Sequence, residues 1–246
     1  MRTEHLPGGH RLHIGDSLPW LQGLEDGSAK AVITDPPYII GATSVGNSGS
    51  KSGTWADMEN AAHWFAAWLR ESRRVTGPDG HIFSCTNWRS LPTMIRAADM
   101  AGFTWNGCAV WDKQWIGPGG NQSFRPRYEL VLHAAGASAS IEDRSTPDVV
   151  AIKWHGTMRA SDHAAEKPVA LYSWAIELAT APGDVIIDPF GGSGTALAAA
   201  DMAGRTCWIS EREPAYADDI RSRVGIRPPP PTNRSLASLP LFRNQE

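Results

Sequence analysis

The segment Asp184–Ala203, DVIIDPFGGSGTALAAADMA, contains three kinds of sequence in succession. Asp184–Asp188 is an apolar run, typical of a strand at the centre of a parallel sheet. Ala196–Ala203 has the pattern of a helix that follows almost at once. The glycines between them remove side chains, so a ligand can approach the backbone N–H groups at the start of the helix. The segment therefore predicts a strand, a ligand-binding loop and a helix.

Strand and helix patterns alternate along most of the chain. Ala31–Thr34 is apolar on both faces, and the helical pattern Met58–Val75 leads into another apolar run at His81–Cys85. Further strands are predicted at Arg11–Ile14 and Arg205–Ser210, and further helices at Leu91–Met100, Val169–Thr180 and Glu213–Val224. Phe103–Trp111 and Tyr128–His133 alternate like a strand pair, which fits an antiparallel edge. The repeated strand, helix, strand order predicts an α/β fold with a parallel sheet.

Length and composition indicate a single catalytic domain. The chain has 246 residues, and we expect the catalytic domain to cover residues 1–226, followed by a proline-rich tail at 227–246. Lysine and arginine together number 23 against 26 aspartates and glutamates, so any contact with nucleic acid must come from a local patch. No run of about 18 apolar residues occurs, and we expect a cytoplasmic protein with no membrane contact.

The three cysteines indicate neither a disulfide framework nor a metal site. Cys85, Cys108 and Cys207 are scattered singly, without a C-x-x-C pair. This spacing is typical of reduced intracellular thiols, and we expect no metal ion.

A second motif follows the predicted strand Ala31–Thr34, where the chain reads Asp35-Pro36-Pro37-Tyr38. The prolines fix the backbone and leave its carbonyls as rigid acceptors. A carboxylate accepts only, and tyrosine adds an aromatic face. This combination suits a planar ring with an exocyclic amino group, because its two hydrogens need two acceptors and its ring needs a surface to stack on. For the motif alone, a turn with a capping aspartate is the alternative.

The glycine loop differs from the common nucleotide fingerprints. Leu197 stands where a dinucleotide site would have its third glycine, and no Gly-Lys-Ser/Thr of a phosphate loop occurs. Glu211 follows the next predicted strand, where it could accept hydrogen bonds from two ribose hydroxyls. Its alternative role is that of an acid favoured at the start of a helix.

Together, TDPPY (Thr34–Tyr38) and DPFGGSGT (Asp188–Thr195) resemble motifs of the S-adenosylmethionine (SAM)-dependent amino-methyltransferases of DNA. The catalytic motif precedes the cofactor motif, which is similar to the permuted β group of adenine-N6 and cytosine-N4 enzymes. The resemblance runs from His13 to Val224. It implies a doubly wound, mostly parallel, seven-stranded Rossmann-like sheet with one antiparallel edge strand and a circularly permuted motif order.

The resemblance also implies roles for individual residues. Catalysis would fall to Asp35, Pro36, Pro37 and Tyr38, with Asp35 and the Pro36 carbonyl holding the amino hydrogens and Tyr38 stacking on the base. The cofactor would be bound by Asp16, Lys167, Asp188, Phe190, Gly191, Ser193, Gly194, Thr195 and Glu211. In this assignment Asp16 meets the adenine amino group, Glu211 the ribose, and Lys167 the carboxylate of the cofactor. The chain departs from the family at His163–Glu166, before Lys167-Pro168, and at Ser210, where glycine is usual.

The reaction implied is methyl transfer from SAM to N6 of adenine, on a base flipped out of double-stranded DNA. Aspartate at the start of the motif favours adenine. Cytosine N4, and amino groups of RNA or of protein glutamine, are the alternatives. DNA would be contacted by Lys113, Arg125, Arg127, Lys153 and Arg159, in recognition segments near residues 113–127 and 136–165.

Two protein partners are also considered. Similar enzymes are often homodimers. The tail sequence SLPLF (Ser238–Phe242) resembles peptides that bind the bacterial sliding clamp, although a tail that packs on its own domain is the alternative.

Overall fold

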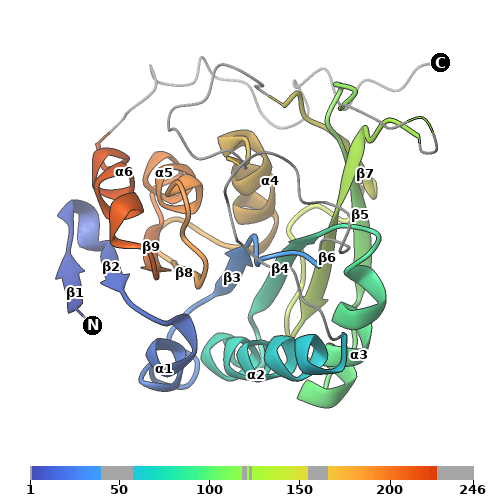
Figure 1. The fold of residues 1–246 in the computed structure, drawn as a ribbon. Helices are drawn as coiled ribbons and strands as arrows, with labels where there is room; N and C mark the ends of the chain where they lie inside the picture. Colours follow the sequence, from blue (N-terminus) through green and yellow to red (C-terminus); the bar gives the residue numbers. More distant parts are fainter. Residues whose placement is uncertain (1, 40–57, 118–120, 122–123, 155–165, 226–246) are drawn as a thin grey trace.

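The computed structural model describes residues 2–39, 58–117, 121, 124–154 and 166–225. These residues form one nine-stranded sheet with helices on both faces (Figure 1). The strands are β1 (Arg2–His5), β2 (Arg11–Ile14), β3 (Ala31–Thr34), β4 (His81–Thr86), β5 (Gly107–Asp112), β6 (Tyr128–Ala135), β7 (Val149–Ala151), β8 (Val185–Asp188) and β9 (Thr206–Glu211). The helices are α1 (Ser17–Gln22), α2 (Met58–Thr76), α3 (Leu91–Ala101), α4 (Val169–Ala179), α5 (Thr195–Met202) and α6 (Ala217–Ser222), with 3-10 turns at Pro7–Gly9 and Pro214–Tyr216.

The strand order is β1-β2-β9-β8-β3-β4-β6-β5-β7. All neighbouring strands from β2 to β4 are parallel, β6 is antiparallel to both β4 and β5, and β1 is antiparallel to β2. The predicted mostly parallel, doubly wound α/β class is therefore confirmed.

The predicted strand number and the predicted place of the antiparallel strand need correction. The sheet has nine strands rather than seven, because short strands extend both edges at Arg2–His5 and Val149–Ala151. An antiparallel strand does lie at one edge, as β1. The antiparallel β6, however, lies inside the sheet, because it pairs with β4 on one side and with β5 on the other. Neither edge strand has a recognisable pattern of its own, because Arg2–His5 is polar and mostly exposed and Val149–Ala151 has only three residues.

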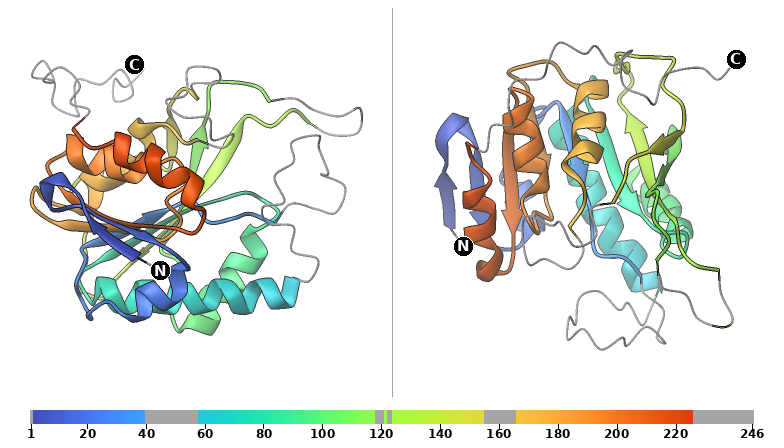
Figure 2. Two further views of the ribbon diagram at one scale, coloured as in Figure 1. Left: turned by 60° about the vertical axis from the view of Figure 1, so that its left-hand side comes forward. Right: turned by 90° about the horizontal axis from the view of Figure 1, so that it is seen from above.

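The two faces of the sheet are covered by separate helical layers. Helices α1, α2 and α3 lie below the sheet in Figure 1, and α4, α5 and α6 lie above it; the left view of Figure 2 shows the same layers. In β8, Ile186 packs into the core on the α4–α6 side, and its neighbour Ile187 packs into the core on the α1–α3 side. The strand is apolar along its length because successive side chains pack against opposite helical layers.

The chain order sets the position of a ligand site. From β8 the chain continues outward to β9, whereas from β3 it continues in the opposite direction to β4, so the winding reverses between β3 and β8. Ligands of such sheets bind beyond the carboxyl ends of the strands at this reversal. The loops after Thr34 and Asp188 both begin there.

No helix in the described ranges has the length and apolarity needed to cross a membrane.

Replacement of Ile187 by alanine is expected to destabilise the fold by about 2–5 kcal/mol, because Ile187 is fully buried at the sheet's centre. Urea unfolding followed by circular dichroism measures the change. Ile95→Ala on α3 is the control; Ile95 is 48% exposed, and its loss is expected to stay within about 0.5 kcal/mol. Equal effects of the two substitutions would contradict the core assignment.

Candidate active site

A hydrogen bond between neighbouring strand ends lies at the centre of the site. The hydroxyl of Thr34, at the end of β3, donates to Asp188 Oδ1, at the end of β8, over 2.5 Å. The same oxygen accepts from the N–H of Phe190 at 3.0 Å. These bonds fix the start of the glycine loop relative to the start of the Asp35-Pro36-Pro37-Tyr38 motif.

Asp188 is buried, and its pKa lies above the ordinary value of an aspartate. Burial raises the pKa of Asp188 to about 7, although the hydrogen bonds from Thr34 and Phe190 oppose the shift; the negative charges of Asp35 and Glu211 add to it. A positively charged ligand nearby would favour the ionised form.

Glycine is required at two positions of the loop. A Cβ on Gly191 would lie 2.7 Å from Ile209 Cγ1, and Gly194 has a φ of +77°, which side chains disfavour. The loop is closed by hydrogen bonds from Gly191 N to the Ser210 carbonyl and from Gly194 N to the Gly191 carbonyl, both 2.8 Å. The chain can therefore pass close to β9 with its backbone uncovered.

The other predicted cofactor residues fall at the same edge of the sheet. Glu211 Oε2 accepts from the N–H of Gly192 and Oε1 from the N–H of Glu213, each at 2.7 Å. Asp16 caps α1 through Leu18 N at 2.9 Å and follows Gly15, whose N–H binds the Glu211 carbonyl. The predicted acids Asp16, Asp188 and Glu211 thus stand at the ends of three adjacent strands.

Three further predicted residues support the loop. Ser193 and Thr195 share a hydrogen bond of 3.0 Å between their hydroxyls. The ring of Phe190 packs against Trp64 and Trp68 on α2, with centroids 5.5 and 5.4 Å away.

Lys167 connects the glycine loop to the second motif. Its carbonyl accepts from the Thr195 hydroxyl at 3.3 Å, while its ammonium lies 2.5 Å from Asp35 Oδ2 and 5.2 Å from the centre of the Tyr38 ring. From the sequence, the Lys167 ammonium is expected to bind the carboxylate of the cofactor. In the structure it binds Asp35, the predicted catalytic aspartate. Burial opposes its charge, but the carboxylates of Asp35 and Glu129 outweigh burial and raise the pKa of Lys167.

Asp35 has one occupied and one free oxygen. Oδ1 is buried and has no hydrogen-bond partner among the described residues, whereas Oδ2 holds Lys167. Beyond Tyr38 the chain is fixed by the N–H of Ile39, which donates to Ser90 Oγ at 2.8 Å. Within the described residues, an acceptor without a donor therefore belongs to a carboxylate that shares Lys167 with the Tyr38 ring.

Glu129, on β6, is a site residue that the sequence analysis missed. Its carboxylate accepts from the Tyr38 hydroxyl at 3.1 Å and from Lys113 Nζ at 3.0 Å. The available signal was a single acid at the start of the apolar run Tyr128–Ala135, but only the antiparallel course of β6 brings it to this edge. Lys113, predicted to contact DNA, is turned into this network and only 12% exposed.

The other residues predicted to contact DNA differ in their exposure and in their hydrogen-bond partners. Arg127 forms two hydrogen bonds of 2.7 Å with Asp112, Arg125 donates to the Gly117 carbonyl at 2.9 Å, and Lys153 is exposed. Arg159 and part of both predicted recognition segments lie outside the described residues, as does Ser238–Phe242. Near Arg125 and Arg127 the structure exposes large aromatic side chains, among them Trp115, Phe124 and Tyr128.

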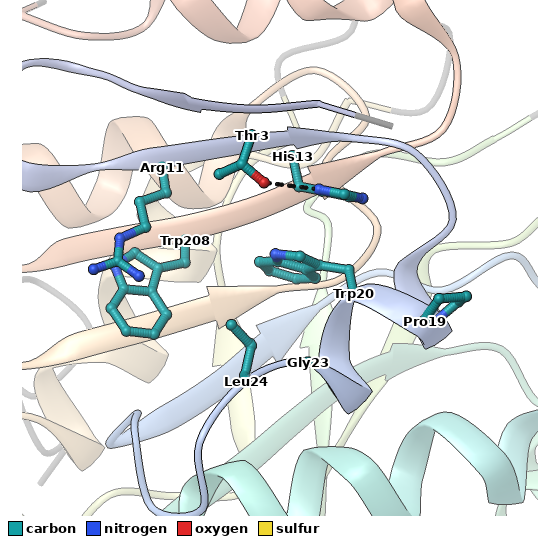
Figure 3. Close-up of a pocket in the computed structure, with 8 residues that line it drawn as sticks. All are labelled: Thr3, Arg11, His13, Pro19, Trp20, Gly23, Leu24 and Trp208. Atoms are coloured by element: carbon teal, nitrogen blue, oxygen red, sulfur yellow. Dashed lines mark hydrogen bonds between the residues drawn. The ribbon is translucent and has the colours of Figure 1, made fainter.

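A separate cavity of about 290 Å³ lies on the α1 side of the sheet (Figure 3). It is lined by Thr3, Arg11, His13, Pro19, Trp20, Gly23, Leu24 and Trp208. Figure 3 shows His13 over Trp20 and the guanidinium of Arg11 over Trp208. None of the predicted site residues lines this cavity. Nor do three His, Cys, Asp or Glu side chains gather as metal ligands anywhere in the described part of the chain.

The sheet has the Rossmann-like fold that solved methyltransferase structures share. The family described as DNA methylase matches residues 29–222, and the chain belongs to this family. The resemblance drawn from Thr34–Tyr38 and Asp188–Thr195 is thereby confirmed.

Individual relatives agree with this assignment. The type II methyltransferase M2.DpnII of Streptococcus pneumoniae is 25% identical over 235 residues, which cover 85% of this chain and 87% of the relative. The cytosine-N4-specific PvuII DNA methyltransferase has a similar structure, with a TM-score of 0.70 at 19% identity, covering 86% of this chain and 85% of that one. The M1.HpyAVI–SAM complex gives a TM-score of 0.67 at 20% identity, covering 86% and 97%. The two solved structures show a common fold.

The raised pKa of Asp188 predicts a particular pH dependence of stability. The folded chain keeps this proton up to about pH 7 and the unfolded chain releases it near pH 4, so the contribution of Asp188 is full below about pH 4 and is lost as the pH rises to about 7. The loss should amount to roughly 2–4 kcal/mol. Asp188→Asn keeps the acceptor for Thr34 and Phe190 but cannot ionise. Urea unfolding of both proteins between pH 4 and 8 measures the difference, and parallel curves would refute the shift.

Proposed function

We propose that this DNA methylase transfers the methyl group of SAM to the N6 amino nitrogen of an adenine rotated out of duplex DNA. The observation that carries the proposal is the buried Oδ1 of Asp35, which has no hydrogen-bond partner among the residues that the structure describes, in a carboxylate linked to the Tyr38 ring through Lys167. A buried carboxylate oxygen without a donor is unfavourable by about 1–3 kcal/mol or more, so a bound donor would be stabilised there. An amino group on a planar ring supplies that donor, and the ring can stack on Tyr38.

The cofactor would bind at the glycine loop. SAM supplies an electrophilic methyl group on a sulfonium ion, and it is the ligand named in the M1.HpyAVI complex. In this chain Gly191 and Gly194 leave the backbone open to it, Glu211 stands where its ribose is expected, and the ionised Asp188 would favour its positive charge. The direct bond from Thr34 to Asp188 keeps this loop beside Asp35, as an in-line transfer requires.

Asp35 would act on the amino group through hydrogen bonding. With Oδ1 and the Pro36 carbonyl accepting the two hydrogens, the nitrogen becomes pyramidal and its lone pair faces the methyl group. SAM would supply the methyl group and keep the electrons of the broken C–S bond on sulfur, and the methylated nitrogen would lose one proton. Asp35 stands at the position to receive that proton first.

Adenine is proposed because aspartate opens the Asp35–Tyr38 motif. Cytosine N4 is the second candidate, because the cytosine-N4-specific PvuII enzyme has a similar fold. The exposed Arg125, Arg127 and Lys153 are proposed to contact DNA, together with Arg159, while Lys113 acts inside the site. A base in the duplex cannot reach Tyr38, so flipping would cost a few kcal/mol.

Incubation with labelled SAM and unmethylated bacterial DNA, followed by nucleoside mass spectrometry, tests the proposal. We expect N6-methyladenine, and sequencing of the methylated product then gives the target site. N4-methylcytosine would select the second candidate. Label confined to RNA or protein would overturn both.

Two substitutions should separate chemistry from cofactor binding. Asp35→Asn keeps the shape of the side chain but offers one acceptor and a competing donor, so we expect turnover to fall by at least about 100-fold with SAM affinity nearly unchanged. Glu211→Ala removes two hydrogen bonds that shape the loop, so SAM affinity should fall by about 10-fold or more. Isothermal titration gives the affinities and the label assay gives the turnover. Equal losses of SAM affinity would mean that the two sites are misplaced.

A further inference from the structure

We propose that Glu129 is a positioning residue for methyl transfer, which holds the Tyr38 ring and receives the Lys167 ammonium when an amino group arrives at Asp35. The inference rests on the proposed transfer to a base amino group and adds a residue to it.

The position of Glu129 in the sheet is unusual for an acid. It precedes the buried residues Leu130, Val131 and Leu132 in β6 and lies opposite Trp111 of β5. It is only 20% exposed. A charge in such a place is unfavourable unless it is paired, so its partners explain its presence.

Glu129 has partners on two sides. On one side Oε1 accepts from Lys113, whose ammonium also lies 5.9 Å from the centre of the Trp111 ring. On the other side Oε2 accepts from the Tyr38 hydroxyl at 3.1 Å and lies 3.3 Å from Lys167 Nζ. Lys113 therefore anchors the carboxylate, and the carboxylate anchors Tyr38 of the motif and Lys167, which binds Asp35.

The hydroxyl contact fixes how the Tyr38 ring is presented. A tyrosine side chain turns about two bonds, and a hydrogen bond at its far end restrains both. Burial, followed by the charges of Asp35 and Glu129, raises the pKa of Tyr38, so the phenol keeps the proton that it donates. A ring held at both ends offers a flipped base one defined stacking surface.

The Lys167 ammonium lies on the other oxygen of the carboxylate that is expected to bind the substrate amino group. It donates to Asp35 Oδ2 over 2.5 Å, whereas the amino group is expected at Oδ1, and it lies 5.2 Å from the centre of the Tyr38 ring. A second donor at Asp35 Oδ1 competes with the ammonium for the same carboxylate charge, so the ammonium is expected to shift toward Glu129 Oε2, which lies 3.3 Å away. The shift leaves no buried ammonium unpaired, which would otherwise oppose base binding.

The charges of the network are balanced. Two ammoniums, Lys113 and Lys167, face two carboxylates, Asp35 and Glu129. Burial alone would raise the pKa of Glu129, but the ammoniums of Lys167 and then Lys113 hold it below its ordinary value, so Glu129 stays ionised. A neutral residue at this position would leave an excess positive charge that binds Lys167 more firmly to Asp35.

The test is a double-mutant cycle in the full chain. Glu129→Gln, Tyr38→Phe and the double variant are compared for kcat, KM for the mapped DNA target, and SAM affinity. We expect Glu129→Gln to lower kcat by about 10- to 100-fold and to leave SAM affinity within about 2-fold. Because Glu129 acts in part through the Tyr38 hydroxyl, the loss in the double variant should be at least about 3-fold smaller than the product of the single losses.

Glu71→Gln is the matched control. Glu71 is 17% exposed and ion-paired with Arg74 on α2, away from the site, so its replacement should leave kcat and KM unchanged. Glu129→Asp keeps the charge but withdraws it from the Tyr38 hydroxyl, and it replaces Glu129→Gln in the cycle if that variant does not fold.

Four results would count against the inference. If the wild type is active and Glu129→Gln has the same kcat, this inference is wrong while the proposed function stands. The same holds if the loss of kcat in the double variant equals the product of the two single losses. Parallel losses of SAM affinity, melting temperature and kcat would indicate a merely structural role. A wild type that leaves DNA unmethylated overturns the proposed function and this inference together.

Discussion

The hydrogen bond from Thr34 to Asp188 is the constraint on which the site depends. It joins the last residues of two neighbouring parallel strands at the point where the winding of the sheet reverses. The glycine loop leaves from one strand and the Asp35–Tyr38 motif from the other, so their separation is set by the spacing of paired strands, about 5 Å. A fixed distance between the two loops suits the proposed transfer between two bound molecules.

Around this centre the protein buries charge rather than avoiding it. Asp35, Glu129, Lys113 and Lys167 come from four separate parts of the chain and neutralise one another. Such a network adds little net stability, because desolvation offsets much of the attraction. What it provides is a set of donors and acceptors that are already oriented before a ligand binds.

Much of the fold could be predicted from the sequence because its signals are local. The apolar strands Ala31–Thr34 and Val185–Asp188, the glycine loop and Glu211 after β9 each follow from composition at neighbouring positions. Glu129 and the partner of Lys167 could not, since these contacts join residues far apart in the chain through an antiparallel strand inserted between β4 and β5. The short edge strands β1 and β7 were missed because β1 is polar and mostly exposed and β7 has only three residues. Only their pairing with β2 and β5 identifies them as strands.

The antiparallel course of β6 also ties the surface of the protein to its centre. Strands β5 and β6 pair from Gly107 opposite His133 to Asp112 opposite Tyr128, and the chain between them leaves the sheet beside Lys113 and Glu129. Substitutions or insertions in that connection need not alter the register below it. Under the proposed function, in which Arg125 and Arg127 of this connection contact DNA, changes in the connection would alter DNA contacts without altering the paired strands or the charges beside them.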